Sequence, residues 1–221
     1  AKPFDFKTLR VMLRIALPSI LQQSVVSLGM LLVQRLVNTF SLDLTTGYYA
    51  AIKIDGMAIV PIVSISNAVS TFTAQNIGAK KIERIPSGYR AAILLDVIFC
   101  VILGVLIYTC APTLVGFFID DNAEAVKLGS WYLYSVGAFY MFIAMMNVTN
   151  GVIRGYGAMK YFVGITIVNL ISRVILAYTL TPVIGYKGIY LSMPLSWVVS
   201  FVTATLVYKY GNWRNVRLIN N

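Results

Sequence analysis

Five ionisable side chains stand inside segments that are otherwise almost wholly apolar, and four of them are predicted to form one cluster: Arg35, Lys53, Asp55 and Arg173. A carboxylate in such a place binds a proton, a sodium ion or an organic cation, whereas an ammonium or guanidinium group binds anions. An ionised side chain left against hydrocarbon costs about 2.5–3.5 kcal/mol or more, so these groups are expected to face a helix bundle interior or a wet cavity. They are candidates for an ion or substrate path.

Asp55 and Arg173 are predicted to lie at the same depth. Each is about eight residues inward from the outer end of its apolar segment, which is about 12 Å along a helix. This geometry permits an ion pair, with Lys53 and Arg35 nearer the surface. The alternative is an ion-pair network that only fixes helix packing, while Arg35 and Lys53 extend to the membrane interface.

Two amides accompany this cluster, because Gln34 and Asn38 flank Arg35 and, four residues apart, share one helix face. Amides in lipid most often join helices through hydrogen bonds worth about 0.6–2 kcal/mol each. This pair, beside a cation, is also a candidate for lining a cavity. Asp96 lies within two helical turns of Arg90, which predicts an interfacial position for this acid rather than a role in ion coupling.

Motifs of catalysis and metal binding are absent from the sequence. The chain has no His, no nucleophile elbow, no phosphate-binding loop and no paired-cysteine spacing. We therefore expect that the protein is not an enzyme and that it has no cofactor and no metal site.

The composition indicates lipid as the surrounding solvent, because 58% of the 221 residues are hydrophobic and only 12% are charged. A helix needs about 20 mainly apolar residues to cross about 30 Å of hydrocarbon. Six segments qualify and no long linker separates them, so the chain is predicted to be one all-α, polytopic membrane domain over residues 1–221. The predicted spans are approximately 11–40, 47–77, 88–111, 124–153, 161–181 and 187–209.

Lys and Arg outside these segments concentrate on one side of the predicted membrane. They lie before the first segment, around Lys80, between Arg154 and Lys160, and after the last segment, whereas the opposite side holds only Lys127 and Lys187. Positive loops stay in the cytoplasm, so both termini are predicted to be cytoplasmic in a multi-pass protein of the cell membrane. This topology accounts for the net charge of +10 without nucleic-acid binding.

Pro18 and Pro61 lie inside predicted spans, where each removes a backbone donor and bends its helix, as a static kink or as a functional one. Gly151 and Gly155 match the G-x-x-x-G dimerisation pattern. Because they lie beside Arg154 at a predicted span end, the sequence favours a loop turn there over a dimer face.

The string TFTAQNIGAKKIERIPSGYR, residues 71–90, resembles the multidrug and toxic compound extrusion (MATE) transporters of the MOP superfamily, especially the bacterial DinF-like members. LRIALPSILQQ in the first segment, GVIRGYGAMK after the fourth and the last two segments extend the resemblance over the chain. Its closing YKYGNW is similar to the end of the C-terminal six-helix lobe of these two-lobe proteins. The resemblance assigns turns to Gln75, Asn76 and Gly78, and to Arg154 and Gly155.

The resemblance implies a secondary active antiporter that exports organic, cationic compounds against entry of H⁺ or Na⁺, by alternating access between two lobes. The implied partners are the lipid bilayer, the other six-helix lobe and a small-molecule substrate. Some family members carry acidic ligands on the first and fourth helices of this lobe. The uncharged parts of those segments, Ile15 to Val33 and Leu128 to Ile153, lack such acids here, which leaves Asp55 as the best titratable candidate or places coupling in the other lobe. Two alternatives stay open: a flippase for lipid-linked oligosaccharides, and a structural membrane subunit that transports nothing.

Overall fold

The structure is a computed structural model that describes residues 6–119 and 121–215, and in these ranges it is helical with no strand, as the sequence predicts. The long helices are α1 (Phe6–Val37), α2 (Leu42–Gly78), α3 (Ile85–Gly116), α4 (Ala123–Gly137), α5 (Tyr140–Gly155), α6 (Met159–Ile184) and α7 (Tyr186–Tyr210). Two short 3₁₀ helices, η1 (Ile82–Arg84) and η2 (Asn212–Asn215), follow α2 and α7.

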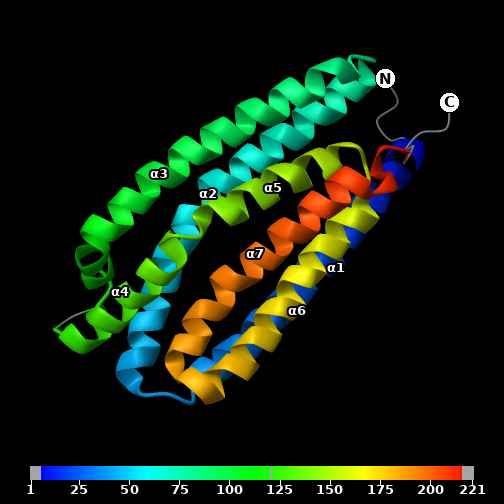
Figure 1. The fold of residues 1–221 in the computed structure, drawn as a ribbon. Coiled ribbons are helices and arrows are strands. Elements are labelled where there is room, and N and C mark those ends of the chain that lie inside the picture. Colours follow the sequence, from blue (N-terminus) through cyan, green and yellow to red (C-terminus); the bar gives the residue numbers. More distant parts are fainter. Residues whose placement is uncertain (1–5, 120, 216–221) are drawn as a thin grey trace.

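The helices form two groups that face each other. One group consists of α2, α3, α4 and α5, and the other consists of α1, α6 and α7 (Figure 1). Contacts of α7 with α4 and α5 hold the groups together, whereas α1 makes few contacts with α2 although the two are consecutive in the chain. The space between the groups is therefore packed along the α5–α7 side and looser along the α1–α2 side.

Five helices are long and apolar enough to cross a membrane, and the described chain has six such spans if α4 and α5 count as one. The sequence predicts a continuous fourth span over 124–153, but α4 and α5 are bent by 52° where they meet. Gly137 is the last residue of α4, and glycine is the poorest helix former after proline. At the break, short-range bonds such as Phe139 N–H to the Val136 carbonyl replace the regular helical ladder.

The segments that carry most of the positive charge lie together. The start of α1, the α2–α3 turn, the α5–α6 turn and the end of α7 all lie at one end of the bundle (Figure 1). This is the arrangement that the charge pattern predicts for a protein with both termini on one side. Which side of the membrane this end faces stays a prediction.

Helix α2 begins at the N-cap Ser41, whose hydroxyl accepts a hydrogen bond from Leu44 N–H. It bends about halfway along its length (Figure 1), and Pro61 lies at the middle of its sequence. Proline removes one backbone hydrogen bond and clashes with the preceding turn, which is the physical cause of such a bend. Pro18 falls within α1, but its side chain lies outside the described residues.

Glycines bring α5 into backbone contact with α2. A Cβ on Gly151 would lie 2.6 Å from the backbone oxygen of Ser66, and one on Gly155 would lie 2.6 Å from that of Ser70. The interpretation of Gly151 and Gly155 as a loop turn is thus wrong, because both lie in α5 and form a helix-crossing face within the chain. Small residues permit this approach, which a larger side chain blocks.

Candidate functional site: two adjoining pockets between the helix groups

Two pockets occupy the space between the helix groups. The larger, about 420 Å³, we call the amide pocket, because six amide side chains line it: Gln22, Gln23, Asn67, Asn147, Asn150 and Asn169. The smaller, about 350 Å³, we call the tyrosine pocket, and its polar lining consists of Gln34, Tyr48, Tyr49, Asp55 and Arg173. The two pockets adjoin, because four residues line both of them: Met30, Ile59, Arg173 and Met193.

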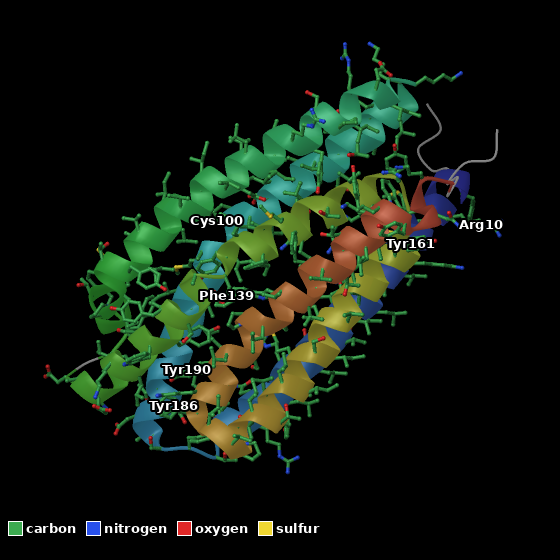
Figure 2. The ribbon with its side chains drawn as sticks, in the orientation of Figure 1. Arg10, Cys100, Phe139, Tyr161, Tyr186 and Tyr190 are labelled. Atoms are coloured by element: carbon green, nitrogen blue, oxygen red, sulfur yellow. The ribbon has the colours of Figure 1, made fainter. Side chains whose placement is uncertain are left out.

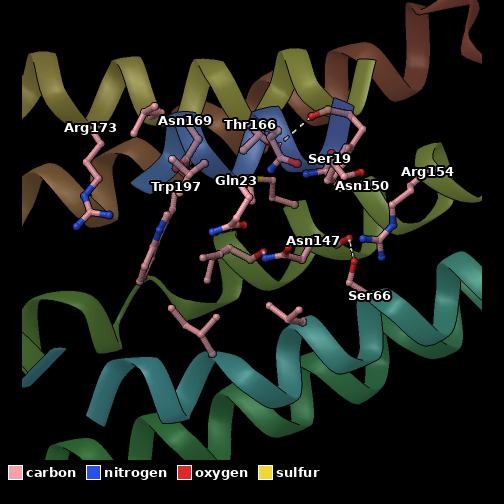
Figure 3. Close-up of a pocket in the computed structure, with 18 of the residues that line it drawn as sticks. Ser19, Gln23, Ser66, Asn147, Asn150, Arg154, Thr166, Asn169, Arg173 and Trp197 are labelled. Atoms are coloured by element: carbon pink, nitrogen blue, oxygen red, sulfur yellow. Dashed lines mark hydrogen bonds between the residues drawn. The ribbon is translucent and has the colours of Figure 1, made fainter. Parts of the chain in front are cut away.

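Hydrogen bonds between α2 and α5 build the end of the amide pocket that lies nearer the α5–α6 turn. The Ser66 hydroxyl donates to the Asn147 carbonyl over 2.6 Å. Arg154 donates from Nη2 to Asn67 Oδ1 over 2.6 Å and from Nε to the Ser70 hydroxyl over 3.2 Å. Figure 3 shows Arg154 and Arg173 at opposite ends of this pocket. Arg154 is thereby held by amide and hydroxyl acceptors rather than by a carboxylate.

The opposite wall is tied by Asn169 of α6, whose Nδ2 donates to the Ser200 hydroxyl of α7 over 2.8 Å. Asn150 is buried, and its Oδ1 has no hydrogen-bond partner among the described residues. No Asp or Glu is among the residues that line the amide pocket. Its lining thus offers two guanidinium groups, amides that both donate and accept, and an apolar wall that includes Trp197.

Asp55 supplies the carboxylate of the tyrosine pocket, and its side chain is only 2% exposed. The Tyr140 hydroxyl donates to Oδ1 over 2.6 Å, and the Tyr132 hydroxyl contacts Oδ2 at 3.4 Å. The same Tyr132 hydroxyl lies 2.8 Å from the Met193 sulfur. Helices α4 and α5, on either side of the break, therefore each contribute one phenol to this acid.

Aromatic rings enclose this carboxylate on several sides. The Tyr132 ring packs edge-on against Tyr48 at 5.3 Å and against Tyr190 at 5.5 Å between centroids, and Tyr140 stacks on Trp197 at 5.6 Å. Figure 2 shows Tyr190 on the α7 ribbon near its beginning, beside Tyr186. Rings that fill the space leave Asp55 few positions from which water can solvate it.

Arg173 lies where the two pockets meet and is 8% exposed. Its guanidinium lies close to the Tyr48 hydroxyl, and its Nε has no hydrogen-bond partner among the described residues. The permitted Asp55–Arg173 ion pair does not form as a direct contact, since the one ion pair found within 4.0 Å in the described chain joins Lys127 and Glu124. The phenols occupy the oxygens of Asp55 instead, and Arg173 attracts this acid only across the pocket.

The other predicted path residues lie in two different environments, at the tyrosine pocket and on the exposed surface of the lobe. Gln34 lines the tyrosine pocket, and Asn38 accepts a 3.0 Å hydrogen bond from the hydroxyl of Tyr49, which also lines it. Lys53 is exposed, with its ammonium 5.6 Å from the Phe118 ring, and Arg35 is exposed as well. Neither cation is among the residues that line the two pockets. Lys53 is exposed although Asp55 is buried, because side chains two residues apart on a helix point in directions that differ by about 200°.

The residues assigned to turns by the family resemblance lie at two helix ends. Gln75, Asn76 and Gly78 form the last turn of α2, where the Lys81 N–H donates to the Asn76 carbonyl and positive φ falls on Lys80 (58°). Arg154 and Gly155 end α5, and there Gly157 takes the positive φ (74°). Both ends have the hydrogen-bond pattern of a Schellman motif.

Tyr132 and Tyr140 are the site residues that sequence reasoning missed. A usable signal was present, because a phenol deep in an apolar segment needs a hydrogen-bond acceptor, and Asp55 is one of few acids in such segments. Which of the 14 tyrosines contact Asp55 depends on the α4–α5 break. Among the described residues, no group of three or more His, Cys, Asp or Glu side chains could hold a metal ion.

Comparisons with known proteins match most of this chain in sequence and in fold. Residues 18–179 match the MatE family model. The chain is similar to the probable multidrug resistance protein YpnP of Bacillus subtilis, at 30% identity over 94% of the chain and 47% of the relative, and to the probable multidrug resistance protein NorM of Thermotoga maritima, at 21% identity over 96% and 46%. The chain spans about half the length of the curated relatives that it matches.

Solved structures also match this fold, again over slightly less than half of their own length. A crystal structure of MATE in complex with MaL6 superposes with a TM-score of 0.85 at 22% identity, over 93% of this chain and 47% of that chain. An outward-facing multidrug resistance MATE family transporter of the MOP superfamily superposes with a TM-score of 0.82 at 20% identity, over 94% of this chain and 47% of that chain. A MOP superfamily transporter from Pyrococcus furiosus, described as having a binding pocket of reverse polarity, superposes with a TM-score of 0.82 at 20% identity. This match covers 89% of this chain and 44% of that chain.

Proposed function

Because this chain belongs to the MatE family of multidrug efflux transporters, we propose that it is one of two lobes of a secondary active exporter of organic compounds. The lobes move relative to each other so that their shared cavity opens to one side of the membrane at a time. Export is coupled to entry of H⁺ or Na⁺. The YKYGNW pattern is similar to the end of the C-terminal lobe in this family, so we assign this lobe to the C-terminal half of the whole protein.

The observation that carries this proposal is the position of Asp55 on the wall of the tyrosine pocket. It is the single acid among the residues that line the two pockets, and its oxygens are oriented by Tyr140 and Tyr132. One carboxylate in an apolar enclosure cannot neutralise two cations at once. An entering H⁺ or Na⁺ therefore displaces an organic cation from Asp55, which is the exchange that antiport requires.

The test uses the full-length transporter that contains this lobe, in inverted membrane vesicles. A proton gradient or a sodium gradient is imposed across the vesicle membrane to drive uptake. Asp55→Asn keeps the size of the side chain and removes its charge, so gradient-driven uptake of a cationic rhodamine dye is expected to fall at least tenfold. Asp43→Asn is the matched control, because Asp43 lies on the same helix and accepts a hydrogen bond from Asn122 at the bundle end. Unchanged coupled uptake by Asp55→Asn removes this acid from the mechanism.

A second candidate function is favoured by the lining of the amide pocket. Two guanidinium groups, six amides and no carboxylate suit an anionic head group rich in hydroxyls, such as that of a lipid-linked oligosaccharide. Arg173 strengthens this candidate, because its buried Nε has no partner among the described residues. In this function the lobe contributes to a flippase rather than to a drug exporter.

A pair of dyes with the same ring system separates the two functions. An exporter of cations moves rhodamine and is little affected by Arg173→Gln, whereas a carrier of anions moves fluorescein and loses this activity in Arg173→Gln. Lys187→Gln is a control for the loss of one positive charge elsewhere in the lobe. If reconstituted full-length protein moves neither dye under any ion gradient, a structural membrane subunit becomes the better description.

A further inference from the structure

A second acid, Asp96, is buried in the lobe away from both pockets. It lies on the inner side of α3 with Ala92, Cys100 and Leu103, which are buried at helical spacing. The opposite side of α3 exposes large apolar residues to the surroundings: Leu95, Ile98, Ile102, Val105 and Leu106. Asp96 is 0% exposed and is not among the residues that line either pocket. Asp96 thus faces the packed interior of the lobe and not the solvent.

Neither carboxylate oxygen of Asp96 has a hydrogen-bond partner among the described residues. An ionised carboxylate without a partner is among the costliest groups to bury, and a buried acid escapes this cost by taking up a proton. The neutral acid costs far less, since it leaves an O–H donor and a carbonyl acceptor unsatisfied but buries no net charge. The burial of Asp96 therefore favours its protonated form in this conformation.

Asp96 has no ion-pair partner among the described residues, and Arg154, the one cation of α5, donates to Asn67 and Ser70 instead. α2 and α3 form an antiparallel hairpin, so Asp96 is level with the second half of α2, and residues 56–78 of α2 contain no titratable side chain. The charged residues of η1 and the start of α3 are exposed at the bundle end: Glu83, Arg84 and Arg90. Those of α4, Glu124 and Lys127, lie at the other end and pair with each other.

The packing of α3 against α5 connects the surroundings of Asp96 with the tyrosine pocket. Cys100 follows Asp96 by one helical turn, halfway along α3 (Figure 2), and belongs to the same buried core as Tyr140 of α5. The Tyr140 hydroxyl donates to Asp55. Tyr140 is the first residue of α5, directly after the break, so a change in the angle between α4 and α5 moves the helix that packs against α3.

We propose that Asp96 is a second proton-binding site of this lobe, separate from the pockets, whose access to water depends on the position of α5 against α3. The Asp96 carboxyl holds its proton while α3 and α5 are closed on it, as in this structure. When α5 moves at the break, the carboxyl releases this proton to water and later takes one back.

Infrared spectroscopy of the full-length transporter in detergent tests this proposal without any transport assay, so its outcome is independent of the proposed function. A protonated carboxyl absorbs at a C=O frequency distinct from that of a carboxylate. The wild type is expected to show such an absorption that declines as the pH is raised, and Asp96→Asn is expected to lack that component. Asp43→Asn, which removes an acid outside the bundle core, is expected to keep it.

Two results overturn the proposal. If Asp96→Asn leaves the protonated-carboxyl absorption unchanged at every pH, Asp96 is ionised and holds no proton. If the component assigned to Asp96 is present but does not change up to the pH of unfolding, the acid is a fixed structural group. Should Asp96→Asn fold poorly, Asp96→Leu provides the same comparison with an apolar side chain of similar size, and the pH dependence of its melting temperature is expected to be flatter than that of the wild type.

Discussion

Tyr140 Oη donates a 2.6 Å hydrogen bond to Oδ1 of Asp55, which joins residues 85 positions apart in the sequence. This bond connects α2 with α5 at the point where α5 departs from α4. A phenol that bonds a carboxylate in an apolar enclosure orients the acid and lowers the cost of its charge. The position of the α4–α5 break thus sets the chemistry of the one acid that lines the pockets.

Tyr140→Phe removes this donor and is expected to destabilise the lobe by about 1–3 kcal/mol, because Asp55 loses a buried partner. Coupled uptake of the rhodamine dye is expected to fall as well, measured in the same vesicles as for Asp55→Asn. Tyr178→Phe is the matched control, since it also removes one phenol bond, to the Leu32 carbonyl at 3.1 Å, but in an exposed position. Equal effects of both substitutions would contradict a special role for Tyr140.

Gly151→Ala is expected to destabilise the lobe by about 1–3 kcal/mol, because the new Cβ would lie 2.6 Å from the backbone oxygen of Ser66 and must push α5 from α2. Gly164→Ala has open space around its Cβ and is expected to be neutral or stabilising by up to about 1 kcal/mol. Thermal unfolding in detergent compares the two variants. A lower melting temperature for Gly164→Ala than for Gly151→Ala would refute the close-contact interpretation.

Asn169 and Ser200 are expected to couple α6 to α7 by about 0.5–2 kcal/mol through their 2.8 Å hydrogen bond. A double-mutant cycle with Asn169→Leu and Ser200→Ala, followed by unfolding, measures this coupling energy. Thr205→Val is the control partner for Asn169→Leu, because the Thr205 hydroxyl bonds the Phe201 carbonyl of its own helix. Coupling to Thr205 as large as that to Ser200 would mean that the bond is not the cause.

The predicted topology is testable by labelling single cysteines, in a background with Cys100→Ala and Cys110→Ser. Both termini are predicted to be cytoplasmic, so Lys127→Cys is expected to react fully with a membrane-impermeant maleimide added to whole cells. Lys81→Cys, exposed in the α2–α3 turn at the other end, is expected to react only after the membrane is opened. The reverse pattern would invert the orientation.

The sequence by itself determined the class of the protein and the placement of its helices at low resolution. Long uncharged segments and confined Lys and Arg require a helical membrane bundle, because backbone polar groups in lipid must be satisfied within each helix. It also identified Asp55, Arg173 and Gln34 as candidates, because an ionisable or amide group in such a segment is rare enough to be recognised without a structure.

Only the tertiary structure decided which partners these groups have. Asp55 and Arg173 lie at similar depth, yet the phenols of Tyr132 and Tyr140 occupy the carboxylate, because the break between α4 and α5 directs them there. Asp96 is near a span end by sequence, yet the packing of α3 against α2 and α5 removes it from solvent. Position along a helix follows from sequence spacing, but the direction a side chain faces acquires meaning only when neighbouring helices pack against it.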